Sequence, residues 1–104
     1  MTQSRIEQFQ AFLDKDPNNS FARYVIAQEQ LKLGRFEEAT ETFAEVIRRD
    51  ADYVAAYFHG GKALETVGRP EDARKVYMDG LAAADRTGNT HARGELQEAL
   101  MALG

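Results

Sequence analysis

The side chains able to carry chemistry are few in this sequence, and none stands at the spacing that a catalytic or metal site requires. The chain has no cysteine, so it offers no thiolate nucleophile, no disulfide and no thiolate ligand for zinc. Its two histidines, His59 and His91, are far apart, whereas a helix-borne metal site needs two histidines four residues apart with a carboxylate. Gly61-Lys62 lacks the earlier glycine and the following serine or threonine of a phosphate-binding loop. The sequence therefore predicts no catalytic residue, no metal and no cofactor.

Adjacent carboxylates are the remaining candidates for acid–base chemistry. Glu37-Glu38 and Glu71-Asp72 each follow a glycine by three residues, which places them in the first turn of the next predicted helix. Negative side chains at that position complement the positive end of the helix dipole. We interpret both pairs as structural.

Composition and charge restrict the partners. The chain has 13 Lys and Arg against 17 Asp and Glu, a formal net charge of -4, which disfavours nucleic acid and anionic membranes as partners. The opening MTQSRIEQFQ lacks the apolar core of a signal peptide, and no apolar run approaches the roughly 20 residues that span a bilayer. With 104 residues, of which 43% are hydrophobic, we expect one cytoplasmic domain over residues 1–104.

The elements that carry these residues repeat along the chain. LKLGRFEEATETF aligns with ETVGRPEDARKVY at a constant offset of 34 residues. The matched pairs are Gly34 and Gly68, Arg35 and Arg69, Glu37 and Glu71, Ala39 and Ala73, and Phe43 and Tyr77. Between them the apolar residues recur three and four apart, which predicts that each unit is a hairpin of amphipathic helices.

Helix-ending signals agree with this periodicity. Ser4 and Glu7 match a capping box, Asp52 is a candidate cap, as is either Asn89 or Thr90, and Pro70 suits the first turn of a helix. We also expect Gly34 and Gly68 to end helices in the left-handed conformation. The pattern predicts six helices, at 4–14, 20–33, 36–49, 53–67, 70–84 and 89–103.

These residues resemble the tetratricopeptide repeat family, whose 34-residue hairpins carry large, small and aromatic residues at fixed offsets. The matches include Ala39, Phe43, Tyr57, Gly61, Ala73, Tyr77 and Gly80. The resemblance implies an all-α fold, a right-handed superhelical array of antiparallel hairpins. It divides the chain into a half repeat at 4–19, repeats at 20–53 and 54–87, and a capping helix at 89–103. Arg23 and Gln30 depart from the pattern, since they replace its large aromatic residue and its tyrosine.

The resemblance also implies a binding surface. In that family the first helix of each hairpin lines a concave groove that holds an extended peptide or a helix of a partner. The corresponding candidates are Phe21, Tyr24, Gln28, Leu31, Lys32, Ala55, Phe58, His59, Lys62 and Glu65. The clamp with which some members grip a terminal carboxylate is absent here. The implied function is a non-catalytic module that binds a protein or peptide partner without a cofactor.

Several alternatives stay open at this stage. Tyr57 and Leu64 already supply a core stripe, so Phe58 points elsewhere, either into the groove or beneath a terminal helix. The same choice applies to Phe21 and Tyr24. Gly60 either opens space beside His59 or accommodates a bulky ring from Tyr24 or Tyr77. The alternative function is a self-associating structural module, which leaves a monomer or a weak homodimer as the expected states.

Overall fold

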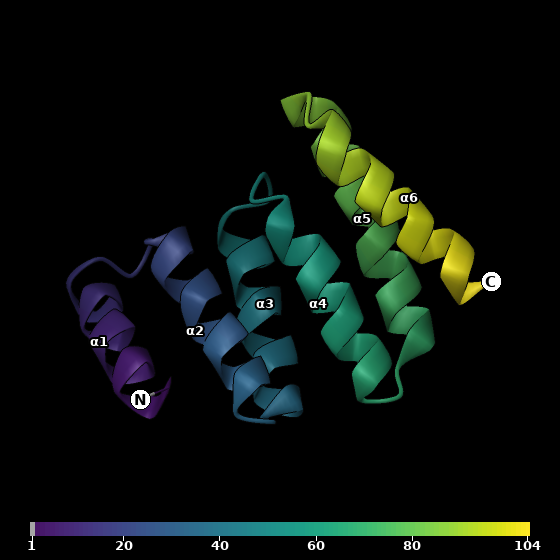
Figure 1. Ribbon diagram of the computed structural model, residues 1–104. Coiled ribbons are helices and arrows are strands. Elements are labelled where there is room, and N and C mark those ends of the chain that lie inside the picture. The colour runs from purple at the N-terminus through teal and green to yellow at the C-terminus, as the bar shows by residue number, and fades with distance from the viewer. Residues whose placement is uncertain (1) are drawn as a thin grey trace.

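The computed structural model describes residues 2–104, with side chains from Ser4 onward, as six helices in antiparallel succession and without a strand over that range (Figure 1). The helices are α1 (Thr2–Lys15), α2 (Ser20–Lys32), α3 (Phe36–Arg49), α4 (Ala55–Thr66), α5 (Pro70–Thr87) and α6 (Thr90–Leu103). Each helix packs against its neighbours along the chain, and α6 also contacts α4. The expected all-α array of hairpins is confirmed.

The helix-ending glycines act as predicted. Gly34 and Gly68 have φ values of 76° and 80°, in the left-handed region that a side chain with a Cβ resists. Pro70 occupies the first turn of α5, and the Asn89 side chain accepts a hydrogen bond of 3.0 Å from the backbone N–H of Ala92 at the start of α6. The local sequence thus sets where these helices begin and end.

Two predicted caps are wrong. Helix α1 begins at Thr2, so Ser4 lies inside the helix rather than before it. Asp52 does not cap α4, which begins at Ala55; its carboxylate instead binds the guanidinium of Arg86 at 3.0 Å. The last turn of α5 brings this cation to the α3–α4 loop, and an ion pair with a nearby arginine replaces the capping bond.

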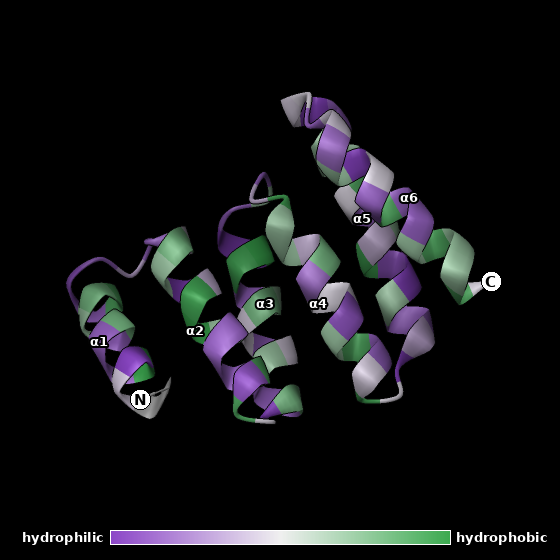
Figure 2. Cartoon of the chain, viewed as in Figure 1, coloured by the Kyte–Doolittle hydropathy of each residue, from purple (hydrophilic) through white to green (hydrophobic). Residues whose placement is uncertain are grey.

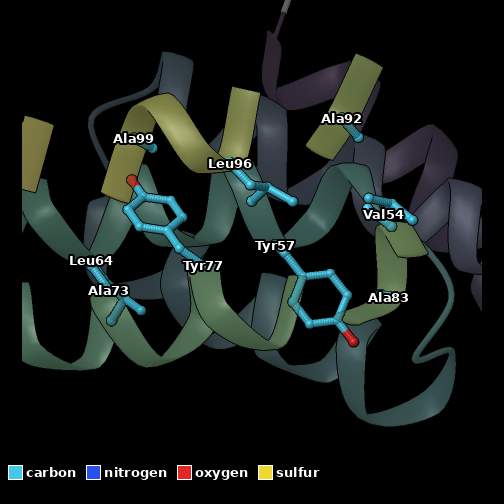
Figure 3. Packing of buried hydrophobic residues seen from close by; sticks show 10 residues of the cluster. Val54, Tyr57, Leu64, Ala73, Tyr77, Ala83, Ala92, Leu96 and Ala99 are labelled. Atoms are coloured by element: carbon cyan, nitrogen blue, oxygen red, sulfur yellow. The ribbon is translucent and has the colours of Figure 1, made fainter. Parts of the chain in front are cut away.

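Burial on one side of each helix holds the array together. Figure 2 shows hydrophilic and hydrophobic residues alternating along the helices, as expected for helices with one buried stripe. The largest cluster joins α4, α5 and α6 (Figure 3) and comprises Val54, Tyr57, Leu64, Ala73, Tyr77, Ala83, Ala84, Ala92, Leu96 and Ala99. A second cluster around Phe43 joins α2, α3 and α4, whereas the cluster between α1 and α2 has only Leu13, Ala22 and Ile26 fully inside.

Glycines allow α4 to approach its neighbours closely. A Cβ on Gly61 would lie 2.6 Å from Cζ of Tyr77, and a Cβ on Gly80 would lie 2.6 Å from Cβ of Tyr57. A Cβ on Gly60 would lie 3.1 Å from Cβ of Phe43. The bulky neighbour that Gly60 accommodates is therefore Phe43, and not Tyr24 or Tyr77 as expected.

The two departures from the repeat pattern produce a polar pocket. Arg23 and Gln30 line a space of about 390 Å³ among α1, α2 and α3, together with Thr42 and Glu45. Gln30 accepts a hydrogen bond of 2.7 Å from the Thr42 hydroxyl, but the buried Nη1 of Arg23 has no hydrogen-bond partner. Burial lowers the pKa of Arg23, and the positive charge of Arg49 lowers it further. This guanidinium is poorly compensated.

Overpacking at Ala73 should destabilise the α4–α5 hairpin. Ala73 is fully buried, so Ala73→Leu is expected to lower the free energy of unfolding by about 1–3 kcal/mol. Urea denaturation followed by circular dichroism measures the change, with Ala82→Leu at an exposed position of α5 as the matched control. An unchanged midpoint for Ala73→Leu would mean that α5 has a different register.

Removing the uncompensated guanidinium should stabilise the fold. Arg23→Met replaces the aliphatic part of the side chain with a similar apolar stem and eliminates the buried donor, so we expect the free energy of unfolding to rise by about 1 kcal/mol. The control is Arg35→Met at an exposed position. A lower urea midpoint for Arg23→Met would show that attraction to Glu45 outweighs the desolvation.

Candidate protein-binding groove

Three helices form one side of the array. Helices α2, α4 and α6 lie together on this side, and α3 and α5 lie behind them (Figure 1). We call this surface the α2–α4–α6 face. These are the first helices of the two repeats and the capping helix, so the surface corresponds to the expected groove.

An aromatic cluster occupies the centre of the α2–α4–α6 face. The ring of Tyr24 lies 5.2 Å from that of Tyr53 and 5.9 Å from that of His59. His59 stacks on Phe43 with centroids 6.4 Å apart, and its edge meets Phe58 at 5.2 Å. The cluster is defined by these five rings. It links the core of the first repeat to the surface of the second.

Burial keeps the titratable groups of the aromatic cluster uncharged. Loss of hydration is the largest cause that raises the pKa of Tyr24 to about 12, and the neighbouring Tyr53 and Glu95 contribute to that value. Burial lowers the pKa of His59, and Glu95 opposes that drop. The centre of the face is therefore neutral at physiological pH and presents apolar surface and hydrogen-bonding groups. Gln28 lies beside the aromatic cluster, and its side-chain amide donates a hydrogen bond of 3.3 Å to the Tyr24 hydroxyl.

Charged residues surround the aromatic cluster on the side of α6. The ammonium of Lys62 lies 5.6 Å from the centroid of Phe58 and 4.0 Å from the carboxylate of Glu65. Across from them, Glu95 and Glu98 of α6 face a hollow of about 440 Å³. We call this space the α4–α6 hollow.

The structure brings five of the candidates together: Tyr24, Gln28, Phe58, His59 and Lys62 lie in or beside the aromatic cluster and the α4–α6 hollow. Phe58 also packs against the core of α4, α5 and α6, so it serves both the hollow and the core.

The other five candidates have different surroundings. Phe21 is 58% exposed and meets Phe9 of α1, at the N-terminal edge of the array. Leu31 packs against the core around Phe43. Lys32 pairs with the buried Glu29 at 3.4 Å.

Glu65 and Ala55 lie at opposite ends of α4. The carboxylate of Glu65 accepts a hydrogen bond from the hydroxyl of Tyr77, which ties α4 to α5. Ala55 lines a separate depression of about 590 Å³ with Tyr53 and the α5–α6 turn. Neither residue borders the α4–α6 hollow.

Sequence reasoning missed Tyr53, Glu95 and Glu98. The sequence predicts α6 as a capping helix, and the groove candidates come only from the first helices of the two repeats. A signal was nevertheless present, because Glu95 and Glu98 alternate with the buried Leu96 and Ala99 and must point away from the core.

The described residues contain neither a metal-binding cluster nor a membrane-spanning helix. Within residues 2–104, no three His, Cys, Asp or Glu side chains gather closely enough to hold a metal ion. Over the same range, no helix combines the length and the apolar character needed to cross a membrane.

Acidification should reveal the burial of His59. The folded state holds His59 neutral at a pH where the unfolded chain already binds a proton, so stability falls as the pH drops below the ordinary pKa of 6.5. His59→Phe should reduce this loss between pH 7 and pH 5 in urea titrations. His91→Phe, at an exposed position, should retain it. Equal pH dependence in all three proteins would contradict the burial of His59.

Comparison with known proteins agrees with the geometry. A tetratricopeptide repeat family model matches residues 1–100. A TPR repeat-containing protein of Pseudomonas aeruginosa is 30% identical over 91 residues, which cover 88% of this chain and 87% of that protein.

Solved structures show the same fold. The crystal structure of a tetratricopeptide repeat domain protein from Salinibacter ruber is 36% identical, with a TM-score of 0.78 over 82% of this chain and 94% of that one. PcrH, crystallised in complex with the chaperone binding region of PopD, has a TM-score of 0.89 over 98% of this chain and 77% of its own, at 16% identity. From the repeated hairpins, the sequence match and the shared architecture, it follows that this chain belongs to the tetratricopeptide repeat family.

Proposed function

We propose that the chain is a non-catalytic interaction module whose α2–α4–α6 face binds a segment of a partner protein, either an extended peptide or a single helix. The observation that carries this proposal is the aromatic cluster, which lies partly exposed at the centre of the face and borders the α4–α6 hollow.

The chemistry of the face suits a peptide. Half-buried aromatic rings such as Tyr24 and Phe58 offer large, rigid contact areas at a low cost in conformational entropy. The Tyr24 hydroxyl and the Gln28 amide supply hydrogen-bonding groups at the edge of these rings. A neutral aromatic centre with a charged rim matches the usual anatomy of a protein interface.

The comparison with PcrH supports the same use of the fold. That protein is recorded with the chaperone binding region of PopD, and its architecture covers 98% of this chain. At a sequence identity of 16%, the two proteins share the fold alone. The fold supports binding of a protein segment, and the identity of that segment is specific to each protein.

Self-association is a second candidate, favoured by an aromatic patch at the other end of the array. Phe12 and Phe21 are 44% and 58% exposed, and both rings meet Phe9. Such exposed apolar surface on α1 and α2 could pair two copies of the chain. Sedimentation velocity tests this candidate: a concentration-dependent dimer that Phe12→Ser with Phe21→Ser abolishes would support it.

Loss of either groove ring should weaken binding more than folding. For peptides selected by phage display against the wild-type chain, Tyr24→Ala or Phe58→Ala is expected to reduce the binding free energy by at least about 1–2 kcal/mol. The stability loss should stay below the roughly 3–5 kcal/mol of an emptied core ring, since both side chains are only half-buried. Fluorescence anisotropy and urea denaturation give the two quantities.

The matched control for this experiment is Phe36→Ala, at an exposed position on α3 outside the α2–α4–α6 face. It should leave the peptide affinity unchanged. Wild-type affinity in a folded Phe58→Ala protein would refute the assignment of the groove.

A further inference from the structure

The α4–α6 hollow has room for one long side chain. Phe58 and Lys62 line it from α4, and Glu95, Glu98, Ala99 and Ala102 line it from α6. The two alanines leave space between the helices, so that the hollow measures about 440 Å³. A flexible aliphatic stem could lie against these methyl groups while its polar head reaches the glutamates.

The negative charges of the α4–α6 hollow lack a strong partner. Among the residues whose side chains the structure describes, Glu98 pairs with no cation, and Glu95 pairs only with His91, 3.8 Å away. That imidazole carries a charge only when it is protonated. Because they stand three residues apart on α6, the two glutamates present their carboxylates to the same space.

The positive charges of the face, in contrast, are already engaged. Lys62 lies over the ring of Phe58 and pairs with Glu65, and Lys32 pairs with the buried Glu29. What the α4–α6 hollow lacks is therefore a cation beside Glu95 and Glu98. An acidic side chain entering the hollow would instead meet two like charges, in a protein of net charge -4.

The ring of Phe58 adds a second recognition element. An aromatic face attracts cations, and the ammonium of Lys62 already lies over this ring, 5.6 Å from its centroid. A guanidinium can stack on a ring and bind carboxylates through two parallel hydrogen bonds, and an ammonium can make the same contacts as a point charge. The methyl groups of the two alanines, the ring and two carboxylates without a strong cationic partner together fit a basic side chain.

We infer that the α4–α6 hollow selects an arginine or lysine side chain of the segment bound on the α2–α4–α6 face. This inference rests on the proposed function and specifies the chemistry of the partner. The aromatic cluster anchors the segment, and Glu95 and Glu98 fix its register by pairing with the basic residue.

The test compares matched peptides and matched protein variants. Short random peptides displayed on phage are selected against the wild-type chain, and the recovered peptides are synthesised with a fluorescent label, each also with every arginine replaced in turn by citrulline and every lysine by norleucine. The protein variants are Glu95→Gln with Glu98→Gln and, as the control with the same change of net charge, Glu7→Gln with Glu41→Gln on α1 and α3. Thermal melts establish that both variants are folded.

The expected result has four parts. The selected peptides share a basic residue, Glu95→Gln with Glu98→Gln weakens their binding by about tenfold, and the control variant binds them like the wild type. The peptide in which the shared basic residue is replaced by citrulline or norleucine binds the wild type and the Glu95→Gln/Glu98→Gln protein equally.

Two other results separate this inference from the function on which it rests. Peptides that lose affinity with Tyr24→Ala or Phe58→Ala, but share no basic residue or bind both variants equally, would overturn the inference and leave the groove assignment intact. Recovery of no peptide that depends on Tyr24 or Phe58 would refute both.

Discussion

The close contact between α4 and α5 sets the position of the whole candidate site. Tyr77 lies against Gly61, and Tyr57 lies against Gly80, so that neither glycine can gain a Cβ without displacing a buried ring. This contact fixes the rotation of α4 about its axis. Because successive residues of a helix are about 100° apart, the neighbours Phe58 and Lys62 must then point to the other side. A side chain at Gly61 would rotate or separate α4, and the aromatic cluster would lose its geometry.

The sequence predicts most of the fold because its signals are local. Gly34, Gly68 and Asn89 mark helix ends through their own backbone or capping chemistry. Asp52 failed as a predicted cap because its partner, Arg86, is remote in sequence and its approach depends on the tertiary arrangement. The predicted end of α5 at residue 84 was three residues early, since the chain stays helical until Gly88 takes the left-handed conformation.

The sequence predicts the candidate residues on α2 and α4, which belong to the repeats, but not those on α6, which follows the last repeat. The register of the hairpin placed Tyr24, Phe58 and Lys62 on one surface, and the structure brings them to the same side. Glu95 and Glu98 belong to α6, which has no counterpart to align with in the repeated units. Their approach to Lys62 follows from the contact of α6 with α4, and this contact cannot be deduced from helix periodicity.

The extra length of α5 makes the two sides of the α2–α4–α6 face unequal. Helix α5 has 18 residues against 14 in α3, an additional turn of about 6 Å, and the α5–α6 turn projects beyond the other turns on its side of the array (Figure 1). Arg86, in the last turn of α5, binds Asp52 and so ties this end of α5 to the α3–α4 loop. The α5–α6 turn therefore extends the array beyond the α3–α4 loop on that side (Figure 1). The backbone alone thus makes the end of the array that carries the α5–α6 turn different in shape from the rest.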